Sequence, residues 1–267
     1  MHTRIVAVAA FVALLAAGCG GPNRHDVVSH YLTQLNAIQA KFTHPLLVVS
    51  TANRDFARPH SNPRAVSTRL LTAARRIDTL RHQLAALTAP AEAQRLKSLL
   101  MQLAAREAAL AREVARLATF LPRFRTTLQP LAKAGTLLKQ ALAGKGSAAV
   151  KATALEAYSA ALGGVLARLQ PLQPPPVGAS LFATQVTTLE GVRASTSALA
   201  KALREKRSTD IPTLLHRFNL AAVGNQSLVA QRAQIQAVRS YNGRIRSLDK
   251  LAIRVTREQV RLQSTLG

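Results

Sequence analysis

The chain is short of several residue types, and each shortage excludes a class of protein. Cys occurs once, Trp is absent, and only 4% of the 267 residues are aromatic. A single Cys excludes a disulfide framework within the chain. The 13 Gly and 12 Pro residues are too few for a collagen-like or linker-dominated sequence. Acidic residues are scarce as well, with 12 Asp and Glu against 36 Lys and Arg.

What remains is an apolar, strongly basic chain. Hydrophobic residues make up 48% and charged residues 18%, with a formal net charge of +24. Because this composition is apolar enough to bury a core, it excludes a disordered basic tail.

The first nineteen residues have the pattern of an export signal. Arg4 precedes an uncharged apolar run over residues 5–17, and small residues lead to Cys19. The run is shorter than the roughly 20 residues that a membrane-spanning helix needs. Gly20, Gly21 and Pro22 then stop helix growth. The pattern therefore indicates a cleaved secretory signal, not a transmembrane anchor.

Cys19 directly follows Ala16, Ala17 and Gly18, and this segment resembles the lipobox of bacterial lipoprotein precursors. The position three before the Cys is usually Leu in that family and is Ala16 here. The resemblance implies cleavage before Cys19 and a diacylglyceryl group on its thiol. We therefore expect a signal peptide at 1–18, a lipidated tether at 19–25, and a protein anchored to the outer face of the bacterial cell membrane. The alternative is an incidental Cys after a plain signal peptide.

The rest of the chain has helical periodicity. Apolar residues recur at spacings of three and four over residues 28–42, 70–87, 96–121, 155–172, 182–203 and 238–266. Such spacing places the apolar side chains on one stripe of each helix, which has to pack against other helices. We predict an all-α fold, an elongated multi-helix bundle of about six helices in a single domain over residues 26–267.

Helix ends are predicted where the sequence supplies caps, glycine or proline. Asn62 is a candidate N-cap for a helix that begins at Pro63, and Ser147 is one for the helix after the 144–147 turn. Further breaks are expected at residues 88–92, 174–178 and 208–212. Pro45, Pro122 and Pro130 lie inside helical stretches, where we expect kinks or short breaks.

A short motif recurs along the chain. Leu84, Leu87, Pro90 and Leu96 are followed 85 residues later by Leu169, Leu172, Pro175 and Leu181. One interpretation is a duplicated helical hairpin, which would give a pseudo-symmetric bundle with a groove between its halves. The other is that any two Leu-rich helices joined at Pro look alike.

The sequence contains few residues in patterns typical of catalytic or metal sites. The sequence has no HExxH, GxSxG or glycine-rich phosphate loop. We therefore expect no enzyme, no cofactor and no metal, and we interpret His25, Asp26 and His30 as solvated residues. Glu107 falls on an apolar stripe, so it needs an Arg partner or a raised pKa. Pairing with Arg at a helix boundary is the preferred interpretation, and a ligand-binding role is the alternative.

The C-terminal helix carries the most concentrated positive charge. Its candidate anionic-surface contacts are Arg239, Arg246, Lys250, Arg254, Arg257 and Arg261. A basic stripe attracts anionic lipid headgroups, although charge runs on helices are often only solvated faces.

The sequence therefore predicts a membrane-tethered, non-enzymatic lipoprotein that acts as an envelope interaction module. Its basic surface would face anionic lipid, wall polymer or an acidic partner. Nucleic acid is not expected, because an exported chain with few aromatics is poorly suited to bind it. The alternative function is a carrier that binds an apolar ligand between helices.

Overall fold

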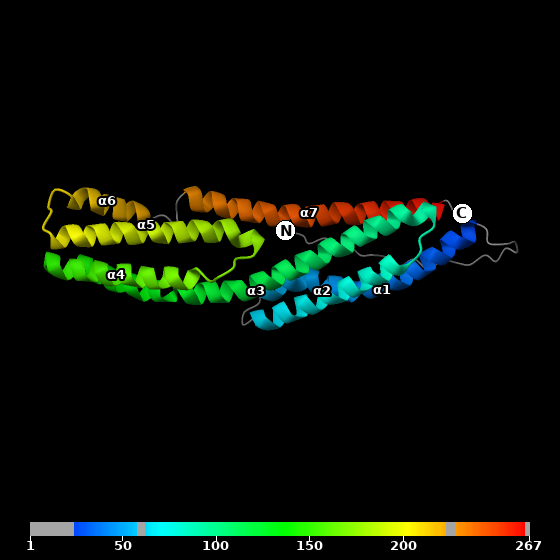
Figure 1. Ribbon diagram of the computed structural model, residues 1–267, viewed down its shortest axis with the longest axis horizontal. Helices are drawn as coiled ribbons and strands as arrows, with labels where there is room; N and C mark the ends of the chain where they lie inside the picture. The colour runs from blue at the N-terminus through cyan, green and yellow to red at the C-terminus, as the bar shows by residue number, and fades with distance from the viewer. Residues whose placement is uncertain (1–23, 58–61, 223–227, 265–267) are drawn as a thin grey trace. The chain divides into compact units, whose positions relative to one another are not determined.

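The computed structural model describes residues 24–57, 62–222 and 228–264, and seven α-helices make up most of these ranges (Figure 1). The described residues contain no strand, so the predicted all-α fold is confirmed. The helices are α1 (Arg24–Ala57), α2 (Pro63–Ala86), α3 (Gln94–Ala143), α4 (Ala148–Leu169), α5 (Ala179–Arg204), α6 (Ile211–Ala222) and α7 (Leu228–Ser264). Two short 3-10 turns are η1 (Ala91–Ala93) and η2 (Pro176–Gly178).

The chain divides into two compact units. The first contains α1, α2, α3 as far as Ala118, and α7 from Arg244. The second runs from Thr119 to Gly243. The sequence predicts a single bundle over residues 26–267. Two helices, α3 and α7, continue through the boundaries between the units, so the apolar periodicity contains no break that marks them.

Each unit has its own hydrophobic core. In the first unit the four helices α1, α2, α3 and α7 supply the fully buried Leu35, Ile77, Leu96 and Leu262. The core of the second unit is formed by α3, α4, α5 and α6. Burial of apolar stripes against neighbouring helices is the main stabilising contribution in such bundles.

The predicted helix ends agree with the structure where it describes them. Asn62 Oδ1 accepts hydrogen bonds from the backbone N–H groups of Arg64 and Ala65, and Pro63 is the first residue of α2. Ser147 Oγ accepts from the N–H of Val150 at the start of α4. Residues 58–61 of the first predicted break lie outside the described residues. Breaks also occur between α2 and α3, α4 and α5, and α5 and α6.

The prolines inside helices do not interrupt them. Helix α1 continues past Pro45, and α3 continues past Pro122 and Pro130. The short breaks expected there are therefore absent. The apolar residues on both sides of each proline keep the helix packed on its core, which outweighs the lost backbone hydrogen bond.

The 85-residue repeat has a structural counterpart. Helices α2 and α4 begin 85 residues apart, and so do η1 and η2, and α3 and α5. Both connecting segments place a proline, Pro90 or Pro175, in extended conformation directly before the 3-10 turn. Buried positions match too, as in the pairs Leu70 and Leu155, Ile77 and Leu162, and Leu84 and Leu169. The agreement supports duplication, with one copy of the hairpin in each unit.

The Asn62 cap should contribute measurably to stability. Asn62→Ala leaves the first N–H groups of α2 without their acceptor, so we expect a loss of about 1 kcal/mol in the free energy of unfolding. Urea denaturation measures the loss. Asn62→Asp keeps the acceptor and should retain most of the stability, and equal losses in both variants would contradict the capping role.

Candidate functional site

All six residues of the basic surface predicted from the sequence lie on α7. In the first unit Leu248, Leu251, Val255 and Leu262 of α7 are buried. Lys250, Arg254 and Arg257 are exposed and succeed one another at helical spacings of four and three. Among the described residues they have no hydrogen-bond or ion-pair partner. We refer to Lys250, Arg254 and Arg257 as the α7 basic row. Arg246 is also exposed on this helix.

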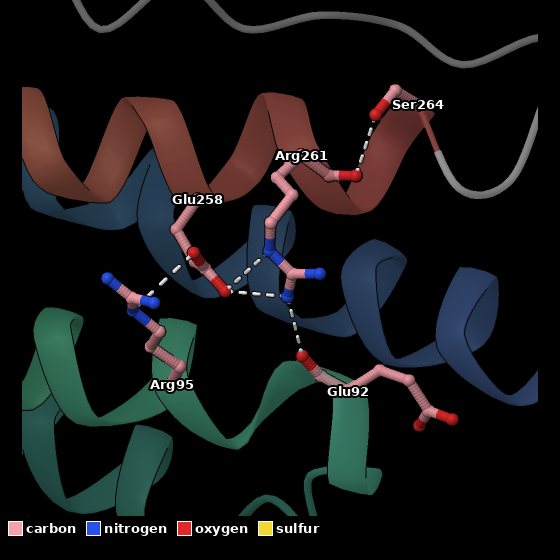
Figure 2. A network of polar contacts seen from close by, with 5 residues as sticks. All are labelled: Glu92, Arg95, Glu258, Arg261 and Ser264. Atoms are coloured by element: carbon pink, nitrogen blue, oxygen red, sulfur yellow. Dashed lines mark hydrogen bonds and ion pairs between the residues drawn. The ribbon is translucent and has the colours of Figure 1, made fainter.

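Arg261 has a different environment, shown in Figure 2. Its guanidinium donates hydrogen bonds to Glu258 Oε1 from Nε at 3.0 Å and from Nη2 at 2.7 Å. The same Nη2 donates to the backbone carbonyl of Glu92 in η1 at 3.1 Å. Arg261 therefore links the end of α7 to η1, which precedes α3. Its guanidinium is hydrogen-bonded within the first unit.

Glu258 is the centre of this network, and only 5% of the residue is exposed. The hydrogen bonds from Arg261, together with the charge of Arg95, hold the pKa of Glu258 below its ordinary value. Arg95 Nε on α3 lies 3.7 Å from Glu258 Oε2. A buried carboxylate stays ionised only with such partners. The network in Figure 2 is thus a structural contact between α7 and α3.

Other carboxylates of the first unit are engaged in the same way. Asp78 on α2 pairs with Arg112 on α3, and Glu113 on α3 pairs with Arg244 on α7. These ion pairs lie between helices. Because Asp78 and Glu113 are paired with Arg112 and Arg244 there, they do not form ion pairs with the α7 basic row.

Glu107 has the raised pKa that was one of two expectations for it. Among the described residues no Arg or Lys forms an ion pair with its carboxyl group, so the preferred pairing with Arg is absent. Burial, and secondarily the charge of Asp249, raise the pKa of Glu107 to about 7. Its neighbour Arg106 instead donates to Ser247 Oγ of α7. Glu107 is therefore a half-buried carboxyl group with a second carboxylate nearby.

The remaining candidates are dispersed. Arg239 is exposed in the second unit, beside Arg232 and Ile235 in a shallow hollow. Cys19 lies outside the described residues. His25, Asp26 and His30 are exposed on α1, and the described residues contain no group of three or more His, Cys, Asp or Glu side chains that could hold a metal ion. None of the helices in the described ranges has an apolar stretch long enough to cross a bilayer.

The structure also contains a polar hollow that the sequence does not predict. It lies between α4 and α5, has a volume of about 570 Å³, and is lined in part by Arg193, Ser197 and Lys201. The signal for it in the sequence is Gly163 inside α4, because glycine weakens a helix and the Arg193 guanidinium lies in the space that a side chain there would take.

Comparison with protein-family models, with curated proteins and with solved structures found no match to this chain.

Proposed function

We propose that this protein is an exported lipoprotein, tethered through a lipid on Cys19 to the outer face of the bacterial cell membrane. It acts there as a non-enzymatic envelope interaction module whose basic surface contacts anionic lipid, wall polymer or an acidic partner. The resemblance of residues 1–19 to a lipobox supports the tether. The observation that carries the interaction role is the α7 basic row, because its three exposed cations have no partner among the described residues.

The electrostatic argument depends on where the few carboxylates lie. Glu113 and Glu258 are buried, and each pairs with an Arg of another helix, Arg244 and Arg95 respectively. Asp249 and Glu258 directly flank the row in sequence, and Asp249 also acts on Glu107. Each cation close to an anionic membrane surface contributes about 1 kcal/mol to attraction, and salt screens this contribution. A row of three cations can therefore hold a tethered domain against an anionic surface. The carrier alternative stays a prediction.

We expect the triple variant Lys250→Gln, Arg254→Gln, Arg257→Gln to bind anionic vesicles roughly 100-fold more weakly than its parent, since about 3 kcal/mol of attraction is lost. Both proteins carry Cys19→Ser, so that no acyl chain contributes to binding. Cosedimentation with phosphatidylglycerol vesicles at two salt concentrations, and with phosphatidylcholine vesicles, measures the difference.

The matched control removes three cations elsewhere in the first unit. Arg64, Arg75 and Arg76 are exposed on α2, and their triple Gln variant has the same net charge as the test variant. If the row is the contact face, the control variant keeps most of its affinity. Equal losses in the two variants would mean that net charge alone attracts the protein, and equal binding to anionic and neutral vesicles would refute the electrostatic mechanism.

A further inference from the structure

The hollow between α4 and α5 of the second unit gathers polar groups from two helices. Arg193, Ser197 and Lys201 follow one another at spacings of four on α5, so they share one face of the helix. Ser159 of α4 lies opposite, and its Oγ is 2.7 Å from Ser197 Oγ. Small residues at this contact, among them Ala160 and Ala200, let the two helices approach closely.

Most charges around the hollow are neutralised by carboxylates. Arg204 donates to both carboxylate oxygens of Glu156, which lowers the pKa of Glu156. Lys201 Nζ lies 3.8 Å from Glu205 Oε1, and Arg207 also pairs with Glu205. Lys201 therefore shares its carboxylate with a closer guanidinium and retains positive charge toward the hollow.

Arg193 is the exception, since its guanidinium has no carboxylate or hydrogen-bond partner in the ranges that the structure describes. It lies over Gly163 of α4, where an added Cβ would be 3.2 Å from the Arg193 Cζ. Glycine at this position leaves room for the guanidinium at the backbone of α4.

The equivalent contact between helices in the first unit contains both a guanidinium and a carboxylate. The 85-residue repeat places Gly163 at the position of Asp78, and Ser197 at the position of Arg112. In the first unit Asp78 and Arg112 form an ion pair between α2 and α3. In the second unit Arg193 supplies the guanidinium, and the carboxylate is replaced by glycine. The second contact therefore has a cation without its internal anion.

We propose that this hollow binds an oxyanion, namely a phosphate group, which takes the place of the missing carboxylate. The Arg193 guanidinium donates two parallel hydrogen bonds to phosphate oxygens. When Ser159 donates to Ser197, the Ser197 hydroxyl hydrogen is free to donate to a third oxygen. Lys201 adds positive charge from the next turn of α5. This site is separate from the α7 basic row and goes beyond the proposed function.

Titration with sodium phosphate tests the site, with the Arg193 Nε–Hε NMR signal of the purified protein as readout and chloride holding the ionic strength constant. We expect a saturable shift of this signal and of the Ser197 amide. In Arg193→Gln the Ser197 amide reports binding at least about tenfold weaker. Gly163→Asp restores the carboxylate that the first unit has, so it should fold and also lose phosphate binding. Arg168→Gln, which removes another exposed cation of α4, is the matched control and keeps the affinity.

Two parallel titrations with different ligands distinguish the source of the phosphate group. Inorganic phosphate alone represents the free ion, and glycerophosphoglycerol represents the diester headgroup of an anionic lipid. Binding of the first only identifies a site for free phosphate, and binding of both identifies a headgroup site. A shift that does not saturate, or equal affinities in wild type and Arg193→Gln, would overturn the proposal. Circular dichroism of each variant confirms that it is folded.

Discussion

Replacing Glu107 with Gln is expected to stabilise the protein at pH 8 by up to about 3 kcal/mol and to leave its stability at pH 4 unchanged. The pKa of Glu107 is raised from 4.5 to about 7, first by burial and then by Asp249. Urea denaturation of wild type and Glu107→Gln at both pH values measures the effect.

The sign follows from which state holds the proton. Between pH 4.5 and 7 the folded chain keeps Glu107 protonated while the unfolded chain releases the proton. Stability contributed by the neutral carboxyl group is therefore complete below pH 4.5, is lost as the pH rises toward 7, and is absent above it. Gln is neutral at every pH and avoids the cost of burying a charge. Destabilisation of Glu107→Gln at pH 8 would mean that the ionised carboxylate makes a favourable contact.

Two further variants control this experiment. Asp249→Asn removes the secondary cause of the raised pKa, so it should give a smaller gain at pH 8. Glu258→Gln makes the same change of charge at a carboxyl group whose pKa is lowered by Arg261. Its stabilising contribution is present above the ordinary pKa of Glu and is lost as the pH falls, so Glu258→Gln should lose stability at pH 8. Opposite signs in two Glu→Gln variants would show that environment, not net charge, decides the effect.

Local features of the fold could be predicted from the sequence because their causes are local. Asn62 and Ser147 cap helices through hydrogen bonds to residues two or three positions further on. Pro90 and Pro175 end one helix and precede the next within a few residues. The division into two units could not be predicted, because α3 and α7 keep their apolar periodicity through Ala118 and Arg244. Domain boundaries are visible in sequence when a linker breaks the pattern, and these boundaries lie inside helices.

The candidate site was predictable only in part, for a related reason. Helical spacing is enough to place Lys250, Arg254 and Arg257 on the exposed face of α7. It also brings Glu258 and Arg261 together, which are three residues apart on the helix, but it does not show the hydrogen bond from Arg261 to the Glu92 carbonyl, because Glu92 is far away in the chain. The hollow beside Arg193 depends on which face of α4 meets α5, and spacing within one helix leaves that open. Contacts between helices, rather than patterns within them, decide which cations remain unpartnered.

The duplicated hairpin predicts matched stability losses at equivalent core positions. Leu84 and Leu169 are 85 residues apart and are 1% and 0% exposed, each in the core of its own unit. Replacing either with Ala removes buried methyl groups and leaves a cavity. We expect each substitution to cost about 2 to 5 kcal/mol in the free energy of unfolding. Guanidinium denaturation followed by circular dichroism measures both losses.

The control for the pair is Leu71→Ala, because Leu71 lies on α2 with Leu84 but is 42% exposed. Its loss should be well below that of Leu84→Ala, since fewer atoms leave a packed environment. Because the two leucines belong to different cores, the double variant should lose close to the sum of the two single losses. A small loss at one position and a large loss at the other would mean that one hairpin copy contributes little to stability. The repeat would then be a coincidence of Leu-rich helices joined at proline.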